Sequence, residues 1–437
     1  MNKAYPKYKS SGVEWLGDVP EHWEVKRLKD LLKVKKGAIK TGPFGSQLLS
    51  SEMYDEDVKV YNQKSVITKD FEYGENYISF EKFKELKEFQ AFPGDFLITT
   101  RGTIGRCAIL PENAEQGILH PCLMRLQTSE DKVYDRFLEI LIEESTLILE
   151  QLRIKSNGTT IEVIYQDSLK NVTVLLPPLP EQQAIAAFLD RETGRIDALI
   201  AKKERLLELL AEQRRALISR AVTKGLDASV KLKPSGVEWL GDVPEHWEVK
   251  RLKYSASTIM GQSPNSDEYS DDADLLPFLQ GNADFTDRYP SPHVYCETAN
   301  KKVPTGSLLI SVRAPVGALN EADQEYGIGR GLCAVISRDG LDKRFSWFSI
   351  QITRTELSTL ATGSTYDAVS ADEVGNMLIP LPPLPEQQAI AAFLDRETAK
   401  IDALSAKVVS VIERLKEYRT ALISSAVTGK IDVREAV

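Results

Sequence analysis

A stretch of seventeen residues that occurs twice constrains this chain more than any other feature. PPLPEQQAIAAFLDRET occupies residues 177–193 and again residues 382–398. A second repeat, SGVEWLGDVPEHWEVKRLK, occupies residues 11–29 and again residues 235–253. Identical stretches of this length do not recur by chance, so the chain is an internal duplication, and such repeats decide the architecture before other patterns do.

The repeats divide the 437 residues into two matching series of segments. Each series runs from the nineteen-residue repeat, which we call the box, through a variable region into a long helical segment. The predicted segments are 1–29 (N-terminal box), 30–176 (first variable region), 177–234 (central long helix and linker), 235–253 (second box), 254–381 (second variable region) and 382–437 (C-terminal long helix).

The two variable regions show weak likeness to each other along their length. AFPGDFLITTRGTIG at 91–105 predicts a turn, a buried strand and a Gly-rich loop, and GSLLISVRAPVG at 306–317 is a degenerate counterpart. Residues 60–63 resemble 277–282, and 158–167 match 363–372. We therefore predict one mixed α/β fold in both regions with diverged loops, which is what two different ligands would produce.

The segment after each variable region predicts a long amphipathic helix. Pro177 and Pro178 hold the approach extended, Glu181 favours the helix N-terminus, and Gly225 and Gly429 end the two helices. Roughly 40 residues at about 1.5 Å each give a rod of about 60 Å. The predicted helix–helix packing residues are Leu189, Ile196, Leu199, Leu206, Leu210 and Leu217 in the first helix, and Leu394, Ile401, Leu404, Val408, Val411, Leu415 and Leu422 in the second.

Two copies of such a helix in one chain give each apolar stripe a partner. The simplest arrangement is an antiparallel coiled-coil pair with pseudo-twofold symmetry, carrying one variable domain at each end. Two helices that each pack only on their own domain are the alternative, which the long uninterrupted stripes disfavour.

The box predicts a turn followed by a strand. Gly17-Asp18-Val19-Pro20 has turn composition, and residues 23–28 alternate as a strand does when it joins a sheet. His22 and its repeat His246 stand beside tryptophans, and we expect packing by the tryptophans with a bystander histidine.

Composition excludes several classes of protein. No run of about 18 apolar residues exists, so no membrane span is predicted, and the start lacks the apolar core of a secretory signal. The four cysteines lack CxxC spacing, which favours free buried thiols of a cytoplasmic protein over disulfides or a metal site.

Charge limits the ways in which this chain can bind nucleic acid. The net charge is −9, and residues 30–176 carry 18 basic against 23 acidic side chains, residues 254–381 only 9 against 17. Neither region has the broad basic excess of a protein that grips phosphates over a large area. Contact with DNA would depend on local patches, or on partner subunits that supply the remaining charge.

Signatures of catalysis are missing from the sequence. There is no G-x-x-x-x-G-K-[ST] phosphate loop, no H-E-x-x-H zinc motif and no tetrad of the amino-methyltransferases. Glu85 and Lys87 have the spacing of a nuclease site, but their lysine- and glutamate-rich surroundings fit a solvated helix face. We predict that the chain binds and does no chemistry.

Candidate DNA-binding residues lie in loops with small or glycine neighbours. Lysines beside the small-residue loop GPFGSQ suit phosphates or base edges, although the same loop fits a turn that serves folding alone. Arginines in Gly-rich loops suit guanine, where a structural ion pair is the alternative, and Gln or Asn suits adenine. The candidates are Lys35, Lys36, Lys40, Gly42, Phe44, Ser46, Gln47, Gln63, Arg101 and Arg106 in the first region, and Gln280, Asn282, Arg313 and Arg330 in the second.

The whole chain resembles the specificity subunit of a type I restriction–modification enzyme. The likeness rests on the box, on GPFGSQL at 42–48 and on LPPLPEQQAIAAFLDRET followed by IDAL in both halves. The resemblance implies that each variable region is a target recognition domain for one half of a bipartite, asymmetric DNA site. It further implies that the helices act as a ruler between the halves and dock two methyltransferase subunits, to which up to two restriction subunits attach.

By the same resemblance, no cofactor belongs to this chain: S-adenosylmethionine belongs to the methyltransferase partner, and ATP with Mg to the restriction partner. Two other classes of function stay open. A coiled-coil scaffold that presents two protein-binding modules would share the repeats and the helices. A stand-alone methyltransferase or nuclease is disfavoured by the missing motifs.

Overall fold

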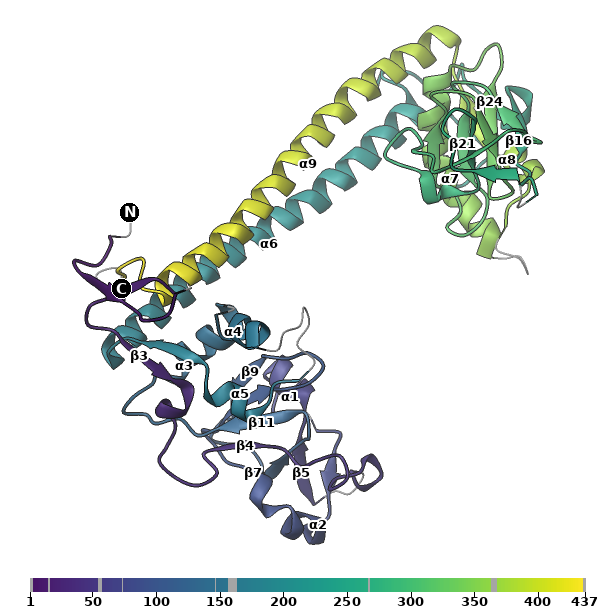
Figure 1. Cartoon of the computed structure of the whole chain (residues 1–437). Helices are drawn as coiled ribbons and strands as arrows, with labels where there is room; N and C mark the ends of the chain where they lie inside the picture. Colours follow the sequence, from purple (N-terminus) through teal and green to yellow (C-terminus); the bar gives the residue numbers. More distant parts are fainter. Residues whose placement is uncertain are drawn as a thin grey trace. The chain divides into compact units, whose positions relative to one another are not determined.

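Two compact units make up the chain (Figure 1). The computed structural model describes residues 3–14, 16–53, 57–72, 74–145, 147–155, 163–265, 268–362 and 368–434. Unit 1 is Met1–Glu204 with Ser410–Val437, and unit 2 is Arg205–Val409. Each unit holds one box, one variable region and parts of both long helices, in line with the duplication. We call residues 30–176 variable domain 1 and residues 254–381 variable domain 2.

Variable domain 1 contains two sheets with short helices around them. Its described strands form sheets of order β4-β11-β8-β9 and β6-β5-β10-β7, in which only the β5–β10 pair is parallel. The strands are β4 (Ile39–Thr41), β5 (Val58–Tyr61), β6 (Tyr77–Ile78), β7 (Gln90–Ala91), β8 (Phe96–Thr99), β9 (Cys107–Ile109), β10 (Gly117–Leu119) and β11 (Leu123–Leu126). The α-helices are α1 (Gln63–Thr68), α2 (Phe80–Glu85), α3 (Asp135–Glu139), α4 (Leu147–Lys155) and α5 (Gln166–Lys170). Three short 3-10 helices, η1 (Leu28–Leu31), η2 (Ser50–Glu52) and η3 (Lys87–Phe89), and the π-helix η4 (Ile140–Glu144) accompany them.

Variable domain 2 repeats this plan. Its described strands form sheets of order β16-β24-β21-β22 and β17-β19-β18-β23-β20, and only β18–β23 is parallel. The strands are β16 (Ala256–Met260), β17 (Tyr269–Ser270), β18 (Leu276–Leu279), β19 (Val294–Cys296), β20 (Lys302–Val303), β21 (Leu308–Ser311), β22 (Leu319–Glu321), β23 (Tyr326–Ile328) and β24 (Leu332–Ser337). The helices are α7 (Lys343–Thr362) and α8 (Ala371–Asn376), with the turns η5 (Leu252–Tyr254) and η7 (Asn282–Asp284).

The shared fold is visible in matching backbone contacts. Arg101 bridges Val163 in one domain, and Arg313 bridges Ala368 in the other. These bridges use the described part of the two stretches that the sequence matched, 158–167 and 363–372, whose residues 158–162 and 363–367 lie outside the described residues. The predicted mixed α/β fold in both halves is therefore confirmed.

One match predicted between the domains is displaced by a residue. The likeness of residues 60–63 to 277–282 pairs Gln63 with Gln280. In the structure His120 N–H donates to Tyr61 O, and its counterpart Gly329 N–H donates to Leu279 O. Gln280 therefore corresponds to Asn62, because the parallel strand pair, and not residue type, sets the register.

Each box joins its variable domain to a long helix. The box hairpins are β1 (Tyr8–Ser10) with β2 (Asp18–Pro20), and β13 (Leu232–Pro234) with β14 (Asp242–Pro244). The predicted box strands are β3 (Glu24–Arg27) and β15 (Glu248–Arg251), which pair with β12 (Thr173–Leu176) and β25 (Leu378–Leu381), the strands that lead into the helices. Trp23 and Trp247 are fully buried, as expected of packing tryptophans, whereas Trp239 of the second box is exposed and its counterpart Trp15 lies outside the described residues.

The acidic residue at the start of each long helix is held by the box. The Glu181 carboxylate accepts hydrogen bonds from Tyr5 Oη at 2.6 Å and Trp23 Nε1 at 2.9 Å, and it contacts His22 Nε2 at 2.7 Å. Glu386 contacts His246 at 2.9 Å. The expectation of bystander histidines is therefore wrong, because both imidazoles bind a carboxylate that is distant in sequence.

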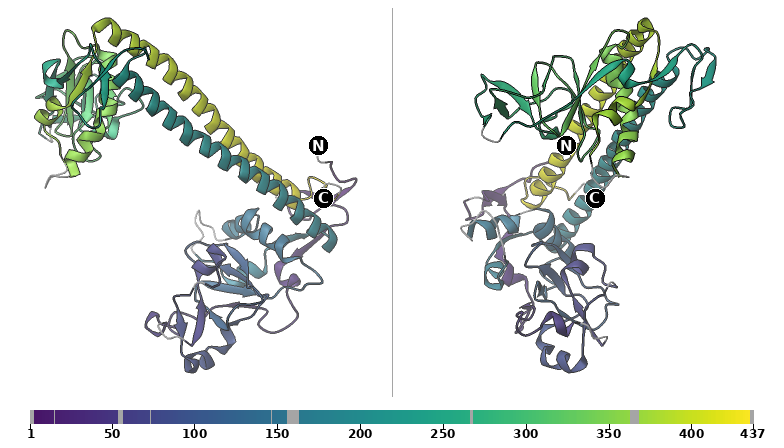
Figure 2. Two further views of the ribbon diagram at one scale, coloured as in Figure 1. Left: turned by 180° about the vertical axis from the view of Figure 1, so that it is seen from behind. Right: turned by 90° about the vertical axis from the view of Figure 1, so that its right-hand side faces the viewer.

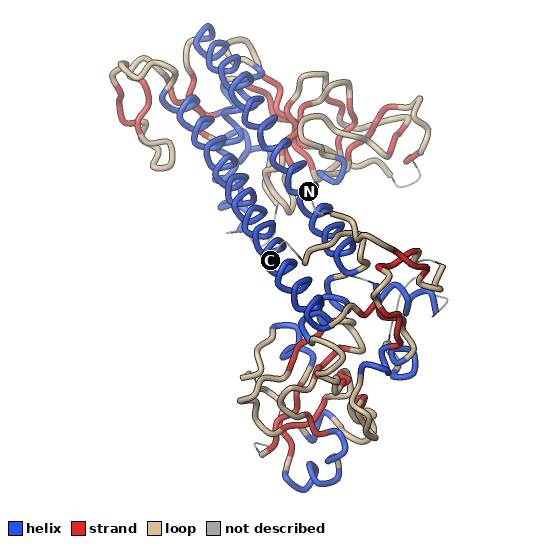
Figure 3. Tube along the Cα trace, turned by 90° about the vertical axis from the view of Figure 1, so that its left-hand side faces the viewer, coloured by secondary structure: helices blue, strands red, loops and turns tan. Residues whose placement is uncertain are grey.

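The long helices, α6 (Leu179–Lys224) and α9 (Leu384–Val427), lie side by side in every view (Figures 2 and 3). In unit 1, Arg419 pairs with Asp197 at 3.0 Å, and in unit 2 Arg214 pairs with Asp402 at 2.8 Å. Low numbers on one helix thus meet high numbers on the other, so the pairing within each unit is antiparallel, as predicted. Gly225 and Gly429 follow the helices with φ of 74° and 71°, a conformation that favours glycine.

Part of the predicted packing stripe is out of phase. The predicted residues Leu189, Ile196, Leu210, Leu394, Val408 and Leu422 are buried, and Leu206, Leu217, Ile401 and Leu415 are half-buried. Leu199, Leu404 and Val411 are exposed, however, and Ile200 and Ile412 are buried in place of two of them. At Leu199-Ile200 and Val411-Ile412 two apolar residues are adjacent, so the periodic pattern does not determine which of the two is buried.

Candidate nucleic-acid interface

Five loops of variable domain 1 converge at one edge, where its two sheets meet. They follow β4, β5, β8 and β10 and precede α5. Backbone hydrogen bonds tie them together: Gly42 N–H to Leu123 O, His120 N–H to Tyr61 O, Thr100 N–H to Cys122 O and Ile164 N–H to Thr100 O, at 2.8–2.9 Å. The loops therefore form one surface supported by buried strands.

A groove of about 370 Å³ lies on this surface. Its lining includes five residues predicted to bind DNA: Lys40, Gly42, Phe44, Gln47 and Arg101. It also includes residues that sequence reasoning missed, among them Glu88, Phe89, Tyr165, Gln166 and Asp167. The predicted residues come from two loops far apart in sequence, and the fold brings them to one place.

Glycine at position 42 is required by a close backbone approach. A Cβ atom there would lie 2.2 Å from His120 O, which no side chain can occupy. Burial lowers the pKa of His120, and its Nδ1 accepts a hydrogen bond from Cys122 N–H at 3.2 Å, which fits a neutral imidazole. The backbone at Gly42 is therefore held against His120, and this histidine adds no charge beside the groove.

Several predicted residues have structural contacts of their own. Gln47 Oε1 accepts a hydrogen bond from Phe44 N–H at 2.9 Å, so this side chain shapes the loop. Lys40 pairs with Glu88 at 2.6 Å and lies over the Phe89 ring. Arg101 and Ser46 are exposed, and 76% of Phe44 is accessible to solvent. Phe44, Gln47 and Arg101 are thus the predicted residues that line the groove and are exposed, and Ser46 is exposed outside the groove lining.

Besides Ser46, four other candidates lie away from the groove lining. Gln63 Nε2 donates to Thr103 O at 3.1 Å in the loop after β8. Arg106 pairs with Glu143 at 2.8 Å, which is the structural role weighed as its alternative. Lys35 and Lys36 line a separate hollow of about 630 Å³ together with three other lysines, Lys29, Lys33 and Lys132. The lysines therefore suit phosphate contact at a second location.

The matching edge of variable domain 2 carries the predicted residues of that half. Gly331 N–H donates to Gln280 O at 3.2 Å, and Val312 N–H donates to Gly331 O at 2.9 Å. These bonds bring the loops of Gln280, Arg313 and Arg330 together, and all three side chains are exposed. Asn282 is half-buried and begins η7. Gly261 repeats the close approach of Gly42, since its Cβ would lie 2.1 Å from Gly329 O.

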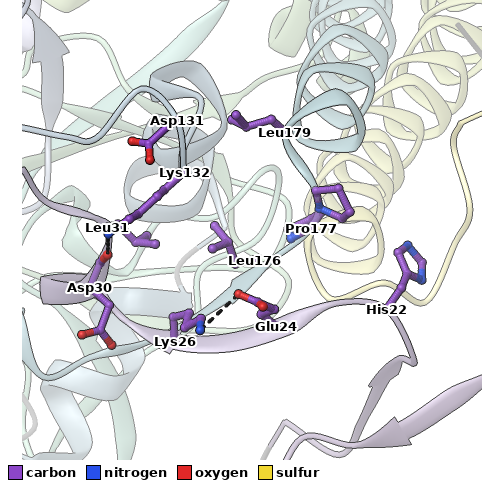
Figure 4. A pocket seen from close by; sticks show the side chains of 11 residues that line it. His22, Glu24, Lys26, Asp30, Leu31, Asp131, Lys132, Leu176, Pro177 and Leu179 are labelled. Atoms are coloured by element: carbon purple, nitrogen blue, oxygen red, sulfur yellow. Dashed lines mark hydrogen bonds and ion pairs between the residues drawn. The ribbon is translucent and has the colours of Figure 1, made fainter.

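A larger hollow, of about 740 Å³, lies elsewhere in unit 1 (Figure 4). His22, Glu24 and Lys26 of the box and Pro177 and Leu179 at the start of α6 line it, and Glu24 pairs with Lys26 at 3.2 Å. These residues belong to the stretches repeated in the other half, so this hollow is built mainly from invariant elements. Its lining also includes Asp30, Leu31, Asp131 and Lys132 of the variable region, and none of its lining residues belongs to the groove described above.

Comparison with known proteins decides the family. The model of the type I restriction modification DNA specificity domain matches this chain twice, at residues 20–209 and 244–414. The chain belongs to this family of DNA specificity subunits. A Methanocaldococcus jannaschii protein with the provisional name of type I restriction enzyme MjaX specificity subunit is 31% identical, over 96% of both chains.

Other relatives carry the same kind of name. The MjaVIII specificity subunit of the same organism is 24% identical over 95% of this chain and 94% of its own length. The EcoKI specificity subunit of Escherichia coli is 21% identical over 66% and 64%.

Solved structures show the same fold. A chain from a study of complex assembly and conformational transition of the type I R-M system superposes with a TM-score of 0.77 at 24% identity, covering 94% of this chain and 99% of that one. The HsdS subunit from Thermoanaerobacter tengcongensis gives 0.59 at 24% identity, over 94% and 98%. The specificity-subunit fold expected from the repeats is therefore confirmed. In the described part of the chain, no helix is long and apolar enough to cross a membrane.

Proposed function

We propose that this DNA specificity subunit reads a bipartite, asymmetric site, one half with each variable domain. The loop edge of each domain is the reading surface. The observation that carries the proposal is a shared scaffold with different side chains at equivalent places: the same bridges hold Arg101 and Arg313, while the residues around them differ. Two surfaces of unlike chemistry select two unlike half-sites, and exposed arginine and glutamine side chains suit base edges.

The acidic charge of the chain supports a division of labour. A protein that neutralises many DNA phosphates without partners, and so releases their counterions, carries a basic surface. This chain instead has a net charge of −9. We propose that two methyltransferase subunits supply further DNA contacts and bind S-adenosylmethionine, and that up to two restriction subunits bring ATP and Mg. This chain then supplies recognition and no catalysis, in the cytoplasm, where its free cysteines stay reduced.

The repeated stretches are the proposed docking faces for the methyltransferase subunits. Two equal partners need two equal faces, and the boxes and helix starts are identical in sequence in both halves. The hollow lined by His22, Glu24 and Pro177 belongs to these stretches and offers a concave surface for one partner. The diverged loops remain available to the DNA.

Methylation mapping tests the proposal. Genomic DNA from cells that express the methyltransferase subunits with this chain should carry methyladenine at one asymmetric two-part motif. Cells that express the methyltransferase alone should lack that motif. Salt-dependent binding of the assembled complex to the mapped duplex is the second readout. A complex that forms but neither methylates nor binds a motif would instead support a protein scaffold.

The proposed ruler has its own test. Insertion of one heptad in α6 after Lys203 and one in α9 after Val408, which occupy equivalent positions, adds about 10 Å of helix. The unspecified spacer between half-sites should lengthen by about three base pairs, while both half-site sequences stay unchanged. Insertion of a full heptad keeps the packing stripe in phase, and a four-residue insertion serves as the out-of-phase control. An unchanged spacer in the methylome would contradict the ruler.

A further inference from the structure

Two positions at the reading edge differ in kind between the variable domains. Tyr165 and Ser370 are equivalent, because Ile164 N–H donates to Thr100 O and Val369 N–H donates to Val312 O, each at 2.8 Å. Phe44 and Ser263 are equivalent, because each follows by two residues a glycine whose N–H donates to the first residue of the central strand, Leu123 O or Leu332 O. Domain 1 therefore has two aromatic rings where domain 2 has two hydroxyls.

The tyrosine occupies a helix cap that serine fills in the other domain. Ser370 caps α8 with its side chain and forms a capping box with Glu373. Tyr165 is the N-cap of α5 and makes no side-chain cap hydrogen bond. Serine is strongly preferred at an N-cap, and large side chains there lose stability. Domain 1 thus lacks the stabilising cap hydrogen bond that Ser370 makes in domain 2, and Tyr165 is 65% exposed to solvent.

Phe44 is exposed in a loop that is held firmly. Gly42 anchors the loop against His120 O, and Gln47 closes it through its bonds with Phe44 N–H and O. A phenylalanine with 76% of its surface in water contributes little to the core. Its counterpart Ser263 accepts a hydrogen bond from Arg330 N–H at 3.4 Å and thereby serves the fold.

Both rings line the same groove, beside Arg101. The Lys40 ammonium is paired with Glu88, whereas Arg101 forms no ion pair with any described residue. A groove with two exposed rings and an available guanidinium suits a flat, apolar ligand with an acceptor edge or a phosphate nearby. A nucleobase has this chemistry, since every base offers a π-face and thymine adds a methyl group.

We propose that Phe44 and Tyr165 are an aromatic pair that contacts a nucleobase of the half-site read by variable domain 1. The inference rests on the proposed function and deepens it, because it assigns apolar readout to domain 1 and polar readout to domain 2. The base is reached either at the thymine methyl in an intact duplex or at the face of an unstacked base.

The test uses the complex of the full chain with its methyltransferase and a duplex that carries the mapped site. The variants are Tyr165→Ser and Phe44→Ser, which install the residues of domain 2, together with Tyr165→Phe, which keeps the ring. Phe80→Ser is the matched control, because Phe80 is an exposed aromatic residue of the same domain outside the groove. Anisotropy titrations give affinity, and thermal melting gives stability.

We expect Tyr165→Ser and Phe44→Ser each to weaken binding about 5- to 150-fold, the usual effect of losing one base–aromatic contact. Tyr165→Phe and Phe80→Ser should bind as wild type. Tyr165→Ser should melt at the same temperature or higher, because serine restores the cap. Lower affinity in a protein of equal or greater stability cannot come from misfolding.

Modified duplexes identify the contact. Uracil in place of thymine should lower affinity where the methyl group is read, and 2-aminopurine fluorescence should rise on binding where a base is unstacked. Absence of both responses, wild-type affinity of Tyr165→Ser and Phe44→Ser, or an equal loss in Phe80→Ser would each overturn the inference. A wild-type complex that selects no motif would instead refute the proposed function itself.

Discussion

Arg101 and Arg313 are equivalent residues that the sequence predicted to bind DNA, and the fold places them at the loop edges that we propose read it. Each is exposed and sits at a backbone bridge, so its position is fixed while its side chain reaches outward. Arg→Ala at a base contact costs about 1–3 kcal/mol and relaxes one position of the motif. We therefore expect Arg101→Ala to relax one half-site and Arg313→Ala the other, as read from the methylome. Arg106→Ala, which breaks a pair with Glu143, is the control for a structural arginine. Uniform loss over all sequences would indicate phosphate contact instead.

Glu181 is the buried acid on which the first box and α6 converge. Burial, followed by the bond to Glu181, raises the pKa of Tyr5, so its phenol stays protonated and donates. The matching Glu386 is more exposed, and Trp247 Nε1 has no hydrogen-bond partner among the described residues. Loss of a charged acceptor costs about 1.5–3 kcal/mol. Glu181→Gln should therefore destabilise unit 1 by about that amount, and Glu386→Gln should destabilise unit 2 by less.

Hydrogen exchange resolved by peptide measures these two effects separately. The expected result is faster exchange in the box and the first turns of α6 for Glu181→Gln. The control, Glu386→Gln, should leave that region protected. Equal effects of the two variants would show that the extra bonds from Tyr5 and Trp23 contribute nothing.

The long helices show what sequence periodicity can and cannot predict. The repeats predicted the elements, their order, their ends at Gly225 and Gly429 and their antiparallel pairing. The phase of the stripe was not predictable at Leu199-Ile200, where two apolar residues of similar size are adjacent. Tyr165 was not predicted for another reason: the match of 158–167 to 363–372 aligns it with Ser370, but only the structure shows that it caps α5 without a side-chain hydrogen bond and lines the groove. Contacts with long sequence separation, such as His22 with Glu181, are likewise invisible to a periodic pattern.

The phase of α6 yields a prediction at the same scale. Ile200 is 9% exposed and Leu199 is 41% exposed, although the two are neighbours. Truncation of a buried isoleucine costs about 2–5 kcal/mol, whereas surface substitutions stay within about 0.5 kcal/mol. Ile200→Ala should lower the urea midpoint of the full chain and Leu199→Ala should leave it near wild type. A larger effect of Leu199→Ala than of Ile200→Ala would show that Leu199 packs in the helix pair, as the sequence predicted.

At the scale of the whole molecule, residues near the two ends of the chain pair with each other in the way that the central linker connects the first half to the second. Lys3 bridges Asp432 in unit 1, and Tyr8 Oη donates to Gly429 O. Through the offset between the boxes Lys3 corresponds to Asp227, and through the offset between the helices Asp432 corresponds to the same Asp227. Lys3 and Asp432 therefore bridge in unit 1 at the position that the central linker occupies as one continuous chain in unit 2.

A half-chain that ends near Ala228 should therefore form a symmetric dimer. It would retain the first box, variable domain 1 and α6. Asp197 corresponds to Asp402 and Arg214 to Arg419, so two copies of α6 can form the Asp197–Arg214 pair twice, as the full chain pairs these positions. The dimer should specify a palindrome of the first half-site. Light scattering measures the mass, and methylome sequencing reads the site.

Charge reversal supplies the control for this dimer. Arg214→Asp should weaken the half-chain dimer through two lost pairs, but the full chain through one. Arg214→Asp with Asp197→Arg should restore both pairs of the half-chain dimer, whereas in the full chain the same double change should break both pairs, because Asp402 and Arg419 are unchanged. Exposed pairs contribute about 0.2–1 kcal/mol each, so the shift in dimer dissociation is modest and requires dilution series. A half-chain that is folded yet monomeric at micromolar concentration would show that the two halves are not equivalent partners. The two halves would then be repeated in sequence without packing equivalently.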